Sequence, residues 1–198
     1  MKAQRLWWIV RTALCRGGRK RAAYAKRAGI YGLMGSNVVM TPLFIPPYSQ
    51  LIRIHDNVII ARGVEFVTHN MISSVLNRIP EAAEGHRFRE QVGCIEIMDN
   101  CFIGINSVIM HGVRIGPNVI VAAGSVVTRD CEPNSVYAGV PARRIGSFDD
   151  YVSKRVRQED AGEITTIARN QAMTEEETRT AWRAFDQRHG SAEAKREV

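Results

Sequence analysis

A six-residue repeat between Ile97 and Glu132 constrains the fold of this 198-residue chain more than any other feature. Every sixth residue from Ile97 to Val127 is Ile or Val, and the fifth position of each hexad is Cys, Ser or Val. A fixed short period is typical of a solenoid, and the two apolar positions alternate across each hexad junction as they do in a β-strand. No helical stripe with a period of about 3.6 residues runs through this segment. Each hexad therefore predicts a short strand and a bend, with its first residue stacked on the equivalent residue of the next coil.

The bends of these predicted coils carry Asn or Gly, at Asn100, Asn106, Gly112, Asn118 and Gly124. Both residue types tolerate the positive φ that a sharp corner often needs. Similar hexads begin at Ile54, break at Ile72 and resume at Ile97. The polar segment 71–93 between them predicts a loop extruded from the coil, and a long loop inside a compact repeat is usually functional.

The two ends of the chain have helical rather than repetitive character. Residues 2–28 predict a helix interrupted near Gly17, and Thr174 with Glu177 predicts the capping box of a helix in the tail. We therefore expect a basic helical arm over residues 1–35, an all-β core over residues 36–146 with the extruded loop 71–93, and a helical C-terminal extension over residues 147–198.

The net charge of +7 is concentrated at the N-terminus. Residues 1–30 contain nine Lys or Arg and no acidic residue, and the first acidic residue of the chain is Asp56. Leu6, Trp7 and their apolar neighbours add a partial hydrophobic face. Two interpretations stay open: the helix caps the open end of the solenoid, or it makes a peripheral contact with an anionic membrane. We expect no nucleic-acid partner, because the arm contains no recognisable nucleic-acid-binding module.

Other whole-chain features favour a cytoplasmic protein, with peripheral contact at the inner face of the membrane as the open alternative. No stretch of about 18 apolar residues is present, so no membrane span is expected. The basic N-terminus lacks an apolar region long enough for a signal peptide. The four cysteines show no metal-type pairing, so a reducing compartment and no bound metal are expected.

Three features together carry a resemblance to a known family. They are the isoleucine-led hexads, the segment from Ala122 to Asp130 (AAGSVVTRD) and the exit from Ala138 to Arg143 (AGVPAR). Over about residues 36–146 the chain resembles the hexapeptide-repeat (isoleucine-patch) acyltransferases, in the branch of galactoside, maltose and polysaccharide O-acetyltransferases. The resemblance implies a left-handed parallel β-helix with three hexapeptide strands per coil. It also implies a homotrimer with acetyl-CoA as co-substrate, bound in the groove between neighbouring subunits.

The resemblance places the family's catalytic histidine at His69, at the end of a hexad and just before the extruded loop. A sugar hydroxyl has a pKa far above neutrality and needs a positioned base, and histidine suits this role. His69 would remove the hydroxyl proton, and backbone N–H groups would hold the oxyanion formed on the thioester carbon. The other histidines fit this role less well. His55 and His111 occupy outward positions, and His189 lies in the tail. His86 lies in the extruded loop, where it could touch the acceptor.

The family's cofactor contacts carry over onto Ala123, Thr128, Arg129 and Arg143, and more weakly onto Ile105. Ala123 would let the pantetheine approach the backbone, and the basic side chains would meet the phosphates of CoA. Galactoside-type relatives carry a polar residue where this chain has Ile105. The family's second site residue, an asparagine from the neighbouring subunit, has no clear counterpart in residues 36–53, and Asn70 is a candidate substitute.

These observations predict an acetyl-CoA-dependent O-acetyltransferase that acetylates a sugar hydroxyl, in a surface polysaccharide or its precursor, by direct transfer. One alternative is an N-acetyltransferase of a nucleotide-linked amino sugar. An alternative of a different class is a non-catalytic hexapeptide scaffold protein. A zinc hydratase of the γ-carbonic anhydrase type ranks low, because His55, His69 and His111 have the wrong spacing for the three ligands of a catalytic zinc.

Overall fold

The computed structural model describes residues 2–79, 81, 85–167 and 172–189. Its contacts divide the chain into two units, of which the first ends at Asp149 and the second begins at Asp150. Parts of the predicted extruded loop (80 and 82–84) and of the predicted C-terminal extension (168–171 and 190–198) lie outside the described residues.

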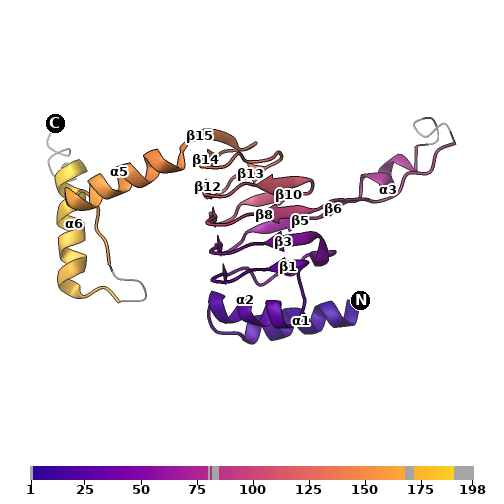
Figure 1. Cartoon of the computed structure of the whole chain (residues 1–198), viewed down its shortest axis with the longest axis horizontal. Coiled ribbons are helices and arrows are strands. Elements are labelled where there is room, and N and C mark those ends of the chain that lie inside the picture. The colour runs from indigo at the N-terminus through magenta and orange to yellow at the C-terminus, as the bar shows by residue number, and fades with distance from the viewer. Residues whose placement is uncertain (1, 80, 82–84, 168–171, 190–198) are drawn as a thin grey trace, which may run out of the picture. The chain divides into compact units, whose positions relative to one another are not determined.

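Short strands in the first unit stack in three sheets, and the three middle turns of the chain each add one strand to every sheet (Figure 1). Sheet 1 contains β1 (Leu33–Met34), β3 (Ile52–Ile54), β8 (Ile95–Ile97) and β11 (Val113–Ile115). Sheet 2 contains β2 (Val39–Met40), β4 (Ile59–Ile60), β9 (Phe102–Ile103), β12 (Val119–Val121), β14 (Ser135–Ala138) and β15 (Arg143–Ser147). Sheet 3 contains β5 (Glu65–Val67), β10 (Val108–Met110) and β13 (Val126–Val127). Neighbouring strands of the three sheets pair in parallel, except β14 and β15. The parallel solenoid expected from the hexads is confirmed.

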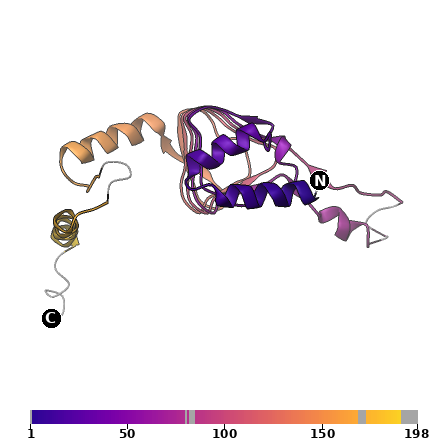
Figure 2. The same ribbon diagram turned by 90° about the horizontal axis from the view of Figure 1, so that it is seen from below.

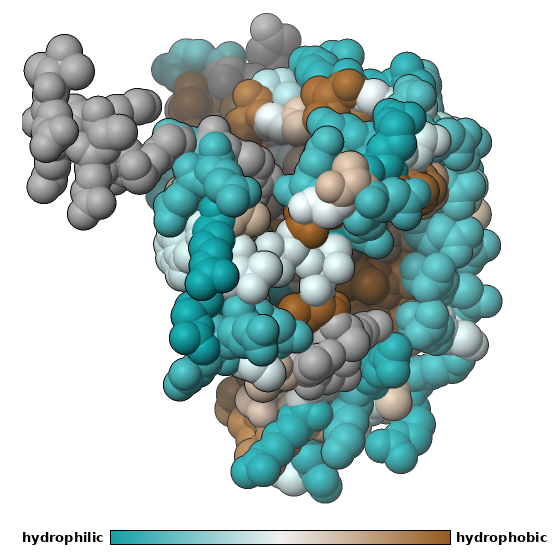
Figure 3. Space-filling model, turned by 90° about the vertical axis from the view of Figure 1, so that its left-hand side faces the viewer, coloured by the Kyte–Doolittle hydropathy of each residue, from teal (hydrophilic) through white to brown (hydrophobic). Residues whose placement is uncertain are grey.

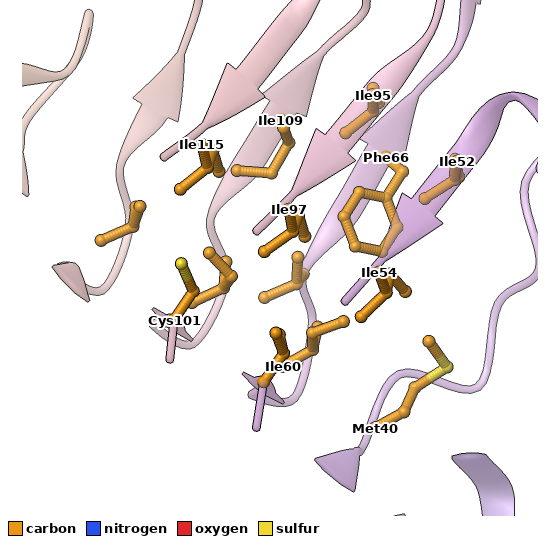
Figure 4. Packing of buried hydrophobic residues seen from close by; sticks show 14 of the residues in the cluster. Met40, Ile52, Ile54, Ile60, Phe66, Ile95, Ile97, Cys101, Ile109 and Ile115 are labelled. Carbon is orange, nitrogen blue, oxygen red and sulfur yellow. The ribbon is translucent and has the colours of Figure 1, made fainter. Parts of the chain in front are cut away.

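The inward positions of the hexads form one continuous core. The leading residues from Ile97 to Val127 are at most 1% exposed, and the fifth positions from Cys101 to Cys131 are at most 3% exposed. Figure 4 shows the isoleucines of successive coils stacked in columns. Burial of one such apolar side chain contributes about 1.5–3 kcal/mol to the free energy of folding. The repeated inward residues therefore stabilise the stacked coils. Hydrophilic side chains cover most of the surface seen in Figure 3, with hydrophobic residues visible between them.

The corners of the coil lie in the left-handed region of backbone conformation, as the sequence predicted. The values of φ are 58° at Asn100, 57° at Asn106, 76° at Gly112, 56° at Asn118 and 69° at Gly124. At one corner the asparagine side chains also bind each other from coil to coil, with each Nδ2 donating to the next Oδ1 over 2.7–2.9 Å. We call this series the asparagine ladder; its members are Asn37, Asn57, Asn100, Asn118 and Asn134.

Two helices lie across the N-terminal end of the coil (Figure 2). They are α1 (Lys2–Leu14) and α2 (Gly18–Arg27), and Gly17 between them has a φ of 90°, so the predicted break in the helix is confirmed. Helix α2 contacts β1 and β2. The first coil begins earlier than residue 36, because β1 already pairs with β3 through Leu33 and Arg53. No isoleucine leads this strand, which is why the repeat pattern missed it.

The extruded loop leaves the coil as a two-stranded ribbon. Strand β6 (His69–Asn70) pairs in antiparallel fashion with β7 (Gln91–Val92), and the short helix α3 (Ile72–Leu76) follows β6. The sequence predicted an extruded loop over residues 71–93, whereas the ribbon at its base already begins at His69. Strand β8 then pairs with β3 in register, Ile52 with Ile95, so the insertion does not disturb the stacking of the coils.

Two helices follow the coil. Helix α5 (Phe148–Asp160) begins just before the division between the units, and α6 (Glu175–His189) lies in the second unit. The predicted capping box is confirmed: the backbone N–H of Glu177 donates to Thr174 Oγ1 over 3.2 Å, and that of Thr174 donates to Glu177 Oε2 over 2.7 Å. Among the described residues, no helix is both long and apolar enough to cross a bilayer.

Candidate functional site

His69 stands where the chain leaves sheet 3 and enters the extruded loop. Its neighbour Thr68 is fully buried and donates from Oγ1 to the carbonyl oxygen of Pro47 over 2.6 Å. On the other side of the loop, His69 pairs with Val92 in the antiparallel ribbon. The backbone of His69 is therefore held between the coil, the Pro47 segment and the returning limb of the loop.

A carboxylate and a tyrosine surround the imidazole of His69. Its Nε2 lies 3.6 Å from Oε1 of Glu90, and the Tyr48 ring meets the imidazole edge-on with centroids 5.5 Å apart. The Tyr48 hydroxyl donates to the other oxygen of Glu90 over 3.0 Å, and this hydrogen bond to a carboxylate raises the pKa of Tyr48. Glu90 thus contacts both rings and can orient the imidazole.

The His69 imidazole is only partly accessible. The side chain is 24% exposed, and its Nδ1 is buried without a hydrogen-bond partner among the described residues. A neutral imidazole has one donor nitrogen and one acceptor nitrogen, and its hydrogen bonds select the tautomer. A histidine held beside a carboxylate in this way can accept and return a proton.

Tyr48 reaches this site through an uncommon backbone conformation. Its φ is 54°, in the left-handed region, where a bulky residue is rarely found. Such positions often cluster at functional sites, where the surrounding structure holds them in place. The turn precedes a short 3₁₀ helix, η1 (Ser49–Leu51), and it brings the phenol ring to His69.

His111 and Asn70 lie at the base of the extruded loop. Asn70 Nδ2 donates to Gln91 Oε1 over 2.8 Å and lies 3.4 Å from His111 Nε2. Gly93 passes so close to His111 that a Cβ at this position would lie 3.1 Å from the Cβ of the histidine. His111 is therefore half-buried against the loop, and Asn70, the candidate substitute for a partner asparagine, binds within its own chain.

The remaining histidines lie elsewhere. His55 lies 3.1 Å from Glu96 on sheet 1, and this hydrogen bond, with one from Arg114, lowers the pKa of Glu96. His86 meets the Phe88 ring within the extruded loop, and His189 lies against Phe185 in α6. Within the parts of the chain that the structure describes, no three His, Cys, Asp or Glu side chains converge as a metal site would require.

The five predicted cofactor residues are exposed and fall into two groups. Ile105 and Ala123 lie at the corner before sheet 3, where the N–H of Gly124 donates to the carbonyl of Ile105 over 2.8 Å. Only a glycine fits at Gly104 beside them, because a Cβ there would lie 2.5 Å from the backbone nitrogen of Ala123. Ile105 and Ala123 therefore lie at the same corner in successive coils.

Thr128 and Arg129 follow β13 at the opposite edge of sheet 3. The N–H of Ala142 donates to the carbonyl of Val126 over 2.8 Å, so the segment that leads to Arg143 runs beside β13. The structure thus groups these three residues apart from Ile105 and Ala123.

His69 lies at the same edge of sheet 3 as Thr128 and Arg129. The strands pair Phe66 with Ile109 and Ile109 with Val127, so the residues after β5 and β13 leave the sheet at one side, two coils apart. This edge combines a histidine beside a carboxylate with exposed basic side chains farther along the coil.

Reasoning from the sequence missed Glu90 and Tyr48. Glu90 lies 21 positions after His69 on the returning limb of the loop, and Tyr48 precedes the regular hexads. Neither residue falls in a periodic pattern or a motif, and only the pairing of the ribbon and the turn at Tyr48 bring them to the imidazole. No signal in this single sequence would have found them.

Comparisons with known proteins agree with this architecture. Residues 95–129 match the model of the bacterial transferase hexapeptide family (six repeats). Over 128 residues the chain is 35% identical to a galactoside O-acetyltransferase of Escherichia coli, covering 61% of this chain and 59% of the relative. It is 43% identical over 115 residues to protein CapG of Staphylococcus aureus, covering 58% of this chain and 62% of that protein. The chain thus spans about three fifths of the length of these two relatives.

The structure is also similar to a crystal structure of a hexapeptide-repeat acetyltransferase from Vibrio cholerae in complex with acetyl coenzyme A. The TM-score is 0.54 at 25% identity, and the match covers 74% of this chain and 86% of that one. Together with the hexads and the stacked parallel coils, these findings show that residues 95–129 form a bacterial transferase hexapeptide repeat and that the chain is similar to acetyltransferases.

Proposed function

We propose that this protein is an acetyl-CoA-dependent O-acetyltransferase that acetylates a sugar hydroxyl in a surface polysaccharide or its precursor. The observation that carries the proposal is the position of His69, beside Glu90 and Tyr48, where the extruded loop leaves the coil. The similarity to a galactoside O-acetyltransferase supports a sugar acceptor. The similarity to an acetyltransferase in complex with acetyl coenzyme A supports the donor.

In the proposed reaction, His69 accepts the proton of the sugar hydroxyl while the oxygen attacks the thioester carbonyl. Glu90 orients the imidazole, because the carboxylate lies 3.6 Å from Nε2. Backbone N–H groups stabilise the tetrahedral oxyanion. The intermediate then expels the CoA thiolate, which takes up the proton from His69, and the acetyl ester of the sugar is released.

The cofactor residues and the assembly complete the proposal. Ala123 and Ile105 would contact the pantetheine at their shared corner, whereas Thr128, Arg129 and Arg143 would bind the phosphates of CoA through charged hydrogen bonds. We propose that the coils are left-handed β-helices and that three copies assemble, with the donor in the groove between neighbours. The four free cysteines are compatible with a place in the reducing cytoplasm.

The experiment that tests this function is a screen of sugar acceptors with radiolabelled acetyl-CoA. His69→Ala should lower kcat by about 10²–10⁴-fold, the range expected for loss of a general base. The affinity for CoA and the melting temperature should stay unchanged. His189→Ala in α6 is the matched control and should retain full activity.

Three outcomes would count against the proposal. Normal turnover by His69→Ala would remove this residue from the site. Transfer to amino groups of amino sugars, and not to hydroxyls, would assign N-acetylation. A protein that neither binds CoA nor transfers acetyl groups would favour the scaffold alternative.

A further inference from the structure

Helix α1 carries an apolar surface that the fold does not use. Leu6, Trp7, Val10 and Leu14 are 63%, 55%, 45% and 73% exposed. With about 100° of rotation per residue, these four side chains fall within one sector of the helix that is about 100° wide. We call this sector the apolar arc of α1.

The opposite face of the same helix already packs against the coil. Thr12 is 2% exposed, Trp8 and Ile9 contact the buried core, and Arg5 Nε donates to the carbonyl of Ile45 over 3.0 Å. Helix α1 is therefore attached without help from the apolar arc. A sector of large apolar side chains that contributes nothing to folding marks a binding surface.

The charges around the apolar arc indicate what binds there. Residues 1–30 contain nine basic and no acidic residues. The guanidinium of Arg11 lies 4.7 Å from the centroid of the Trp7 ring, at the border of the arc. Further exposed cations follow between the two helices and along α2: Arg16, Arg19, Lys20 and Arg27.

We propose that the apolar arc of α1 and these basic residues bind the surface of an anionic phospholipid membrane. Trp7 and the two leucines insert at the boundary between headgroups and acyl chains, while the cations contact the phosphates. A helix with an apolar sector, an aromatic residue and neighbouring basic side chains suits the interface between membrane and water. Because α1 and α2 lie across the N-terminal end of the coil (Figure 2), that end of the solenoid faces the lipid. This inference goes beyond the catalytic proposal and does not depend on it.

Vesicle flotation of the full chain tests the inference. We expect binding to vesicles of phosphatidylcholine with 30% phosphatidylglycerol, and little binding to phosphatidylcholine alone. The double variant Leu6→Ser/Leu14→Ser should lower the partition coefficient on the order of a hundredfold, because two inserted side chains are lost. Arg19→Gln/Lys20→Gln should lower it by about fivefold for each charge removed, and should weaken its dependence on salt.

The matched control is Val152→Ser/Val156→Ser on α5. These valines are also exposed, at 44% and 52%, and also have basic neighbours in the sequence, so this variant should bind as the unmodified chain does. All variants change exposed residues, and their melting temperatures verify folding. Absence of flotation, or equal binding to neutral vesicles at any salt concentration, would overturn the inference. It would also be overturned if Leu6→Ser/Leu14→Ser changed the oligomeric state without changing flotation, since a second copy of the chain would then cover the arc.

Discussion

At the scale of single residues, the site depends on a contact between three side chains from separate parts of the chain. Tyr48 comes from a turn before the regular coils, His69 from the end of a hexad and Glu90 from the returning limb of the extruded loop. Glu90 uses one carboxylate oxygen for each ring, Oε1 towards His69 and Oε2 for the Tyr48 hydroxyl. The carboxylate can therefore act as the positioning group of the imidazole.

Glu90→Gln should lower kcat by roughly tenfold and leave the KM for acetyl-CoA nearly unchanged. The amide keeps the shape of the side chain but removes the negative charge that faces the imidazole, and a loss of about 1.4 kcal/mol in the transition state is a factor of ten in rate. Tyr48→Phe should have a smaller effect of roughly two- to threefold, because the ring stays beside the imidazole. Steady-state kinetics of both variants measure these effects.

Glu65→Gln is the control for this prediction. Glu65 is an exposed residue at the start of β5, the strand that leads to His69, and does not contact the imidazole. Equal kinetic effects of Glu65→Gln and Glu90→Gln would show that Glu90 has no special role. If Glu90→Gln raised the KM for acetyl-CoA and left kcat unchanged, Glu90 would instead be assigned to the binding of acetyl-CoA.

At the scale of elements, the asparagine ladder links all coils along one corner. Asn118 donates to Asn134 over 2.7 Å and accepts from Asn100 over 2.9 Å, while its own φ is 56°. Each asparagine therefore serves twice, through its tolerance of the left-handed region and through its side-chain hydrogen bonds.

Asn118→Ala should destabilise the protein by about 2–3 kcal/mol, since it loses two hydrogen bonds and replaces a residue that tolerates the left-handed region with one that does not. Asn118→Gly should be milder by several tenths of a kcal/mol, because glycine adopts this conformation without strain. Urea unfolding of both variants separates the two contributions. If the alanine variant is as stable as the unmodified chain, the ladder has no energetic role.

The elements also explain what could be predicted from the sequence. The strands, the inward residues such as Ile103 and the corners such as Asn106 depend on neighbours a few positions apart, so the period of six residues revealed them. The contact of Glu90 and Tyr48 with His69 depends on segments that meet only after the loop has folded, and no local pattern encodes it.

The roles assigned to His69 and to the five cofactor residues stay predictions for a related reason. The resemblance places the donor in a groove between two subunits, and the geometry of such a groove depends on a second chain. Ile105 and Ala123 lie at one corner and Thr128 with Arg129 at another, and in the proposed groove a neighbouring subunit would contribute to the same site.

At the scale of the whole molecule, the stabilising core belongs to the first unit. The cluster of buried hydrophobic residues runs from Ala22 to Ala142, and the described side chains of helices α5 and α6 contribute none to it. A fragment of residues 1–149 should therefore fold by itself and have a free energy of unfolding within about 0.5 kcal/mol of that of the full chain. Chemical denaturation of both proteins tests this. A markedly less stable fragment would assign a structural role to the second unit.

The two ends of the coil are closed by different means. Helix α2 contacts β1 and β2 at one end, and β15 runs antiparallel to β14 at the other. A parallel coil exposes unpaired N–H and C=O groups at each end, and such edges are templates for further strands. Because β15 is antiparallel to β14, it ends the parallel ladder of sheet 2, and helix α2 covers the first strands of sheets 1 and 2 at the opposite end. These covered ends disfavour the stacking of one molecule on the next, so the repeated motif does not extend into a filament.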